Sequence, residues 1–157
     1  MTESAVIHDT FVIERTYSAA AERVFAYLSE PAKVRRWYAE SDSHEVESFE
    51  VDFRVGGAER STFRLGDKTP FPGLVMVNEG RFEDIVPNSR IVATTSMTFG
   101  ARRISTSLIC FELFADGDGT KVVLTHKACF YEGADGPQMR KDGWIALLNR
   151  LGQVMAN

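Results

Sequence analysis

His126 is the side chain best suited to acid–base chemistry near neutral pH, because an imidazole titrates in that range. It lies in the segment TKVVLTHKACF (residues 120–130), which alternates as a half-buried strand does. His126 falls on the apolar face of this strand, and no Asp or Glu on that face of the surrounding hairpin would orient its ring. We therefore interpret His126 as a hydrogen-bonded histidine of the core or of a cavity wall.

A second candidate for chemistry is the polar segment ERSTFRL (residues 59–65). Alternate residues of a strand face opposite sides, so the inward set is either Glu59, Ser61 and Phe63 or the residues at 60, 62 and 64. Either set places polar groups on the core side. Polar groups that converge within an apolar lining are typical of a ligand pocket. An edge strand with solvated charges would give the same pattern, and both interpretations stay open.

Other charged and polar residues give weaker signals. Glu79, Arg81 and Glu83 alternate along one strand, and we expect ion pairs on the outer face because isolated buried charges are costly. His8 and His44 complete no metal-ligand spacing with His126. No Ser-His-Asp set or glycine-rich phosphate loop is found. We expect neither a metal nor another cofactor.

The composition is that of an ordinary globular protein. The 157 residues include 44% hydrophobic and 25% charged residues, with a net charge of -4. This charge disfavours nucleic acids and anionic membrane surfaces as partners. The first residues lack a secretory signal, and no apolar run could span a membrane. We expect one cytoplasmic domain over residues 1–157, with residues 1–9 as a loose tail.

The N-terminal third predicts one strand and two short helices. The residues of TFVIERTY (10–17) are largely β-branched or aromatic, as in a strand. Ser18 is suited to cap a following helix, whose buried side would include Val24, Phe25 and Leu28. Pro31 opens a second short helix, because proline is favoured in a first helical turn.

The middle of the chain predicts hairpins. FEVDFRV (49–55) and ERSTFRL (59–65) flank the turn glycines at 56 and 57. Two further pairs of segments follow, 74–86 with 90–99 and 103–114 with 120–130. A two-residue turn at 117 and 118 would place His126 opposite Ile109. The loop GDKTPFPG (66–73) is interpreted either as a mobile lid carrying Phe71 and Pro72 or as an exposed loop tip.

The two cysteines are predicted to be free thiols. Cys110 and Cys129 fit no zinc or redox spacing. The predicted register separates them by about 13 Å along the strands, which exceeds the reach of a disulfide.

The last helix predicts the fold class. Apolar residues recur there with a helical period, at Trp144, Leu147, Leu148, Leu151 and Met155. This apolar side needs a cover, and the curved antiparallel sheet needs one too. We therefore predict an α+β fold in which the sheet wraps around the long C-terminal helix.

Three segments together show a family resemblance that extends over the chain from Thr10. They are residues 11–38, residues 80–97, and GTKVVLTHKACF with the later GWIALLNRL. The chain resembles the activator of heat-shock protein 90 ATPase homologue-like family of the START-like (SRPBCC, polyketide cyclase-like) superfamily. The resemblance implies a helix-grip fold whose sheet and long helix enclose a cavity for a small, mostly hydrophobic ligand. Superfamily members include lipid carriers, hormone-type receptors, aromatic cyclases and co-chaperone domains, so the fold alone does not choose a function.

We expect the chain to bind a small hydrophobic, aromatic or amphiphilic ligand, as a monomer or homodimer. The alternatives are a cyclase, hydratase or hydrolase that uses His126 or Glu59 as a base, and a co-chaperone-like interaction module. No catalytic motif is recognisable, so no catalytic residue is assigned. The candidate cavity residues are Trp37, Tyr38, Glu59, Ser61, Phe63, Phe82, Ile109, Phe111, His126, Phe130, Trp144, Leu147 and Leu148.

Overall fold

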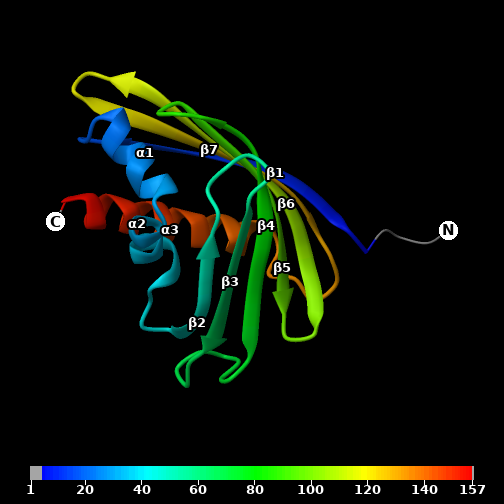
Figure 1. Ribbon diagram of the computed structural model, residues 1–157. Helices are drawn as coiled ribbons and strands as arrows, with labels where there is room; N and C mark the ends of the chain where they lie inside the picture. The colour runs from blue at the N-terminus through cyan, green and yellow to red at the C-terminus, as the bar shows by residue number, and fades with distance from the viewer. Residues whose placement is uncertain (1–4, 157) are drawn as a thin grey trace.

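The chain forms one antiparallel sheet that curves around a long helix (Figure 1). The computed structural model describes residues 5–156. The strands lie in the order β1-β7-β6-β5-β4-β3-β2, which confirms the predicted helix-grip arrangement. The strands are β1 Ile7–Tyr17, β2 His44–Val51, β3 Ala58–Leu65, β4 Val75–Val86, β5 Arg90–Phe99, β6 Arg102–Asp116 and β7 Gly119–Phe130. The helices are α1 Ala21–Ser29, α2 Pro31–Val34, the π-helical turn η1 Arg35–Ala39, and α3 Pro137–Ala156.

Strand β1 begins earlier than the sequence suggested. Ile7, His8 and Asp9, expected in a loose tail, pair with the end of β7 instead. The edge of β7 offers backbone partners as far as Phe130, and these outweigh the polar side chains of His8 and Asp9. Residues 1–4 of the expected tail lie outside the described residues.

Helix α1 does not use the cap predicted for it. Its N-cap is Ala20, which has an extended backbone and makes no side-chain cap hydrogen bond. The predicted cap, Ser18, lies two residues too early. The first turn carries Glu22, whose negative charge is favourable at a helix N-terminus. Val24 and Leu28 are buried as predicted.

The β6–β7 hairpin has the predicted register. His126 pairs with Ile109 across a turn in which Gly117 has a φ of 58°. In that register Cys110 lies opposite Thr125, four pairs from Cys129. Both cysteines are free thiols, as predicted.

Helix α3 buries the predicted apolar stripe. Trp144, Leu148, Leu151 and Met155 are buried, whereas Leu147 is only partly buried at the edge of the contact. Two side chains from the N-terminal third also hold the helix. The Tyr17 hydroxyl donates to the Leu148 carbonyl at 2.7 Å, and Arg23 donates to the Met155 carbonyl at 2.6 Å.

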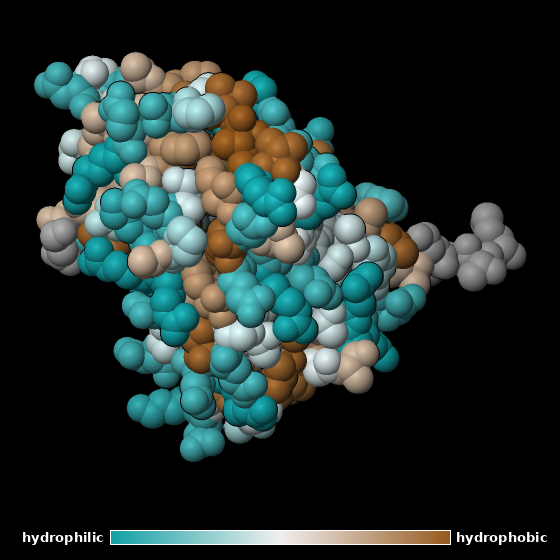
Figure 2. Space-filling view, viewed as in Figure 1, coloured by the Kyte–Doolittle hydropathy of each residue, from teal (hydrophilic) through white to brown (hydrophobic). Residues whose placement is uncertain are grey.

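The outer face of the sheet is polar and is separate from the core. Arg60 and Arg103 both approach Glu79, and Arg81 pairs with Glu83 at 3.3 Å, as expected for solvated ion pairs. Figure 2 shows a mostly hydrophilic surface on one face, broken by small hydrophobic areas. Within the described residues, no helix has the length and hydropathy needed to cross a membrane.

Candidate functional site

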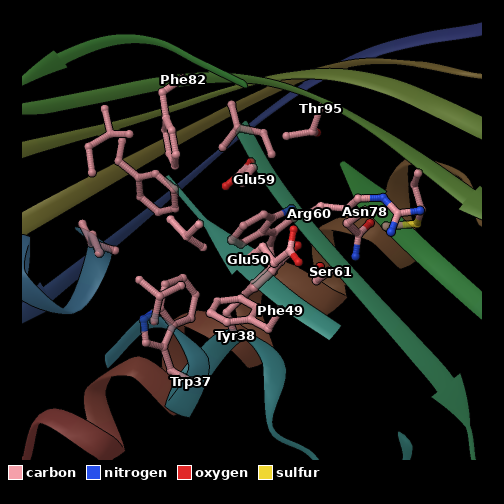
Figure 3. A pocket seen from close by; sticks show the side chains of 18 of the residues that line it. Trp37, Tyr38, Phe49, Glu50, Glu59, Arg60, Ser61, Asn78, Phe82 and Thr95 are labelled. Atoms are coloured by element: carbon pink, nitrogen blue, oxygen red, sulfur yellow. The ribbon is translucent and has the colours of Figure 1, made fainter. Parts of the chain in front are cut away.

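A cavity of about 100 Å³ lies between the concave face of the sheet and the helices. The aromatic side chains of Trp37 and Tyr38 reach it from η1, and Trp144 reaches it from α3. Phe82 and Phe111 approach from the central strands. Figure 3 shows Glu59 between Phe82 and Thr95 on one side and the rings of Trp37 and Tyr38 on the other.

Nine of the thirteen candidate residues line this cavity. They are Trp37, Tyr38, Glu59, Ser61, Phe82, Ile109, Phe111, His126 and Trp144. They come from six elements distant in sequence, which the fold brings to one place. The open question about β3 is answered by its register: Ser61 and Phe63 are buried, whereas Arg60 and Arg64 are exposed.

The other four candidates lie around the cavity but do not line it. Phe63 packs against His44, with ring centroids 4.4 Å apart. Phe130 lies behind His126 and beneath the Arg140 guanidinium, 5.1 Å from its ring centroid. Leu148 is fully buried in the core, and Leu147 packs at its edge. The periodicity that found these two residues identifies a buried side of a helix and cannot separate core from cavity wall.

The aromatic wall is held by a hydrogen bond to a residue outside the cavity and by contacts between its own rings. The indole N–H of Trp37 donates to the Tyr27 carbonyl at 2.7 Å, which leaves the ring face for packing. Tyr38 stacks on Trp144 at 6.2 Å, and Trp144 meets Phe111 edge to face at 6.0 Å. Such mutual contacts hold the rings in place without filling the space between them.

Glu59 is a carboxyl group without a charged or hydrogen-bonding partner in the described part of the chain. Its cross-strand neighbours are Val51 on β2, which is apolar, and Gly80 on β4, which has no side chain, so neither can pair with it. Burial raises the pKa of Glu59 to about 7. Burial also raises the pKa of Tyr38, and the nearby Glu59 carboxylate adds to that rise. At pH 7 Tyr38 is therefore neutral, whereas Glu59 is about half ionised.

His126 is buried in the cavity wall with both ring nitrogens unpaired among residues 5–156. Its ring stacks on Phe11 at 4.5 Å with an angle of 8° between the planes. His126 lines the cavity, but the hydrogen bond expected for it is missing among the described residues. Burial lowers the pKa of His126 to about 4, and the positive charge of Arg140 acts in the same direction. The imidazole is neutral at pH 7.

Sequence reasoning missed Arg140, which also lines the cavity. Its guanidinium is 8% exposed and forms two hydrogen bonds of 2.8 Å with Asp135. It also donates to the Ser105 hydroxyl at 3.0 Å. A signal was present, since Arg140 stands one helical turn before Trp144 on the same stripe. An arginine on an apolar stripe needs a partner, and Asp135 lies just before the helix.

The site can be characterised by the side chains that line it. Among the described residues, no group of His, Cys, Asp and Glu could hold a metal ion. The site combines apolar and aromatic walls with a few polar groups, of which Glu59 and His126 lack partners. A curved antiparallel sheet with a cavity against its C-terminal helix defines the class of START-like, helix-grip domains.

Comparison with known proteins gives the family. The family described as "Activator of Hsp90 ATPase homolog 1-like protein" matches residues 18–156, and the chain belongs to it. Among curated proteins, no sequence matches the chain.

Solved structures share the whole fold. A protein from Rhizobium leguminosarum is 34% identical with a TM-score of 0.89, and the match covers 96% of each chain. The protein Mll3558 from Rhizobium loti is 39% identical with a TM-score of 0.85, over 96% of this chain and 99% of that one. CalU16 from Micromonospora echinospora, at 22% identity and a TM-score of 0.60, covers 98% of this chain and 85% of its own, and shows the fold alone.

Proposed function

We propose that the chain binds a small hydrophobic or amphiphilic molecule in the cavity between the sheet and α3. The observation that carries this proposal is the cavity with its aromatic lining and the Glu59 carboxyl group, which has no ion-pair or hydrogen-bonding partner among residues 5–156. A buried polar group without a partner costs free energy. That cost is offset when a bound molecule supplies the missing partner.

The cavity volume limits the size of the ligand. An apolar cavity of about 150 Å³ is sufficient to bind benzene. The cavity here, about 100 Å³, is smaller but is bordered by the exposed residues Glu50 and Arg60, so a molecule with one small ring or a short chain can extend beyond it on that side. A larger ligand would require the walls to move. We extend the proposal to a cytoplasmic protein that acts as a monomer or homodimer.

A second candidate function is an enzyme in which Glu59 acts as a general base. A carboxyl group with a pKa of about 7 is well matched to proton transfer near neutral pH. Neutral His126 would then contribute a hydrogen bond rather than a charge. Binding needs only the groups described, whereas catalysis needs a paired acid as well, so we favour binding.

The experiment that tests binding fills the cavity with a larger side chain. Ile109 lines the cavity from β6, whereas its neighbour Leu108 lies on the outer face and is 38% exposed. Ile109→Trp should weaken the binding of a fluorescent apolar probe by about tenfold or more, while Leu108→Trp should retain it. Circular dichroism must show both variants folded.

The outcomes of this experiment separate a cavity from a packed core. A packed core would lose about 1–3 kcal/mol of stability on overfilling and would bind no probe in the wild-type chain. Absence of probe binding to the wild-type chain, or equal binding to both variants, would contradict the proposal.

A further inference from the structure

The charged residues Arg140 and Glu59, which line the cavity, differ in whether a residue of opposite charge already pairs with them. Arg140 is the cation of the lining that is buried, and its Nε and Nη2 atoms donate to Asp135, Ser105 and the Met97 sulfur. The bidentate ion pair with Asp135 offsets the positive charge of Arg140. Glu59 has no comparable partner within the described residues.

The groups that face Glu59 from other elements leave its charge uncompensated. Tyr38 from η1 and His126 from β7 are neutral near pH 7, and Arg140 from α3 is paired with Asp135. The adjacent Ser61 hydroxyl and the Asn78 amide, which lie opposite each other on β3 and β4, are neutral as well.

The rim of the cavity carries two further charged residues, one of each sign. Glu50 and Arg60 border it with exposed side chains. The Arg60 guanidinium approaches Glu79, on the opposite face of the sheet from Glu59. Glu50 is the cross-strand partner of Arg60 and shares that outer face, so Glu59 is the carboxyl group on the cavity side.

Aromatic rings surround Glu59 on several sides. Trp37, Tyr38 and Trp144 approach from the helices, and Phe49 and Phe82 approach from the strands. The faces of such rings attract cations, and an aromatic cage is a common means of binding an ammonium group. The Glu59 carboxylate, which lines the same cavity, supplies the counter-charge.

We infer that the ligand carries a basic amine or other small organic cation, whose charged group lies beside Glu59 and whose apolar part lies against Ile109 and Phe111. This inference rests on the proposed binding function and specifies the chemical class of the ligand.

Binding of a cation has a proton signature. When the cavity holds no ligand, the Glu59 carboxyl group is about half protonated at pH 7, because its pKa is raised to about 7. An ammonium group binds the ionised form, so each binding event at pH 7 should release about half a proton. The affinity should rise as the pH increases from 6 to 8 and then level off, because Glu59 is then ionised before the ligand arrives.

The test compares benzylamine, benzyl alcohol and benzoate, three molecules of similar size and different charge. Isothermal titration calorimetry at pH 8 should give benzylamine an affinity about tenfold higher than benzyl alcohol, which is the size of one charge-assisted hydrogen bond. Benzoate should bind least. Titrations in two buffers of different ionisation enthalpy should show the proton release at pH 7.

Two variants make the test specific. Glu59→Gln should reduce the ratio of amine to alcohol affinity to near one and abolish the proton release. Glu79→Gln removes an equal charge from the outer face and should retain the preference. Benzyl alcohol binding as tightly as benzylamine would overturn the cation inference and leave the binding function standing. Failure of all three molecules to bind the wild-type chain would overturn both.

Discussion

Two charged groups that line the cavity, Arg140 on α3 and Glu59 on β3, differ in their surroundings. Arg140 is buried against Asp135, Ser105 and the ring of Phe130. Glu59 stands among aromatic rings, with no ion pair or hydrogen bond to its carboxyl group among the described residues. One charge is part of the framework and the other is free to meet a ligand. Burial alone therefore does not mark a functional group, but burial without a partner does.

The largest effect should come from breaking the framework pair. Asp135→Ala leaves the Arg140 guanidinium buried without its counter-charge, and we expect a loss of about 3–4 kcal/mol of unfolding free energy. Chemical denaturation measures this loss. Asp142→Ala, which removes an exposed carboxylate bonded to Gln138, serves as the control and should cost less than about 1 kcal/mol. Equal losses would show that Arg140 is not held by Asp135.

A smaller effect, dependent on pH, is expected at His126. Its pKa is lowered to about 4, so the unfolded chain binds a proton more readily below pH 6.5 and stability falls from there toward pH 4. At pH 5 the penalty is up to about 2 kcal/mol. His126→Phe keeps a ring between Phe11 and Phe130 and should remove this penalty. Denaturation at pH 5 and pH 7.5 measures it.

The unfolding free energies of His126→Phe and the wild-type chain at the two pH values test this prediction. The variant should gain stability over the wild-type chain at pH 5 and lie within about 1 kcal/mol of it at pH 7.5. A difference that is independent of pH would mean that His126 titrates as it does in the unfolded chain.

Local patterns predicted the parts of the fold that depend on neighbours in sequence. The period of α3 revealed its buried side, and the alternation around His126 with a glycine turn set the β6–β7 register. The same information failed at Ser18, because a capping residue identifies a helix start only to within a few residues. It also failed at Ile7, whose place in β1 depends on the distant edge of β7.

The site was less predictable because its character depends on contacts across the fold. The sequence does not determine which face of β3 points inward, because both faces contain charged residues. The pairing of Ser61 with Phe49 and Asn78 in the sheet determines it. The pairing of Arg140 with Asp135 could have been suspected from the stripe on α3. The lack of a partner for Glu59 and for His126 could not have been predicted in this way, because a sequence does not show which polar groups remain unpaired.

The titration of the Glu59 carboxyl group tests the central claim most directly. Carbon-13 NMR of the side-chain carboxyl, assigned by the signal that disappears in Glu59→Gln, gives its pKa in the protein as folded. The surroundings described here predict a midpoint near 7, because burial without a partner raises the pKa from 4.5. A midpoint near 4.5 would show that the carboxyl group is solvated or paired, and would contradict its role as the unpaired charge of a binding cavity.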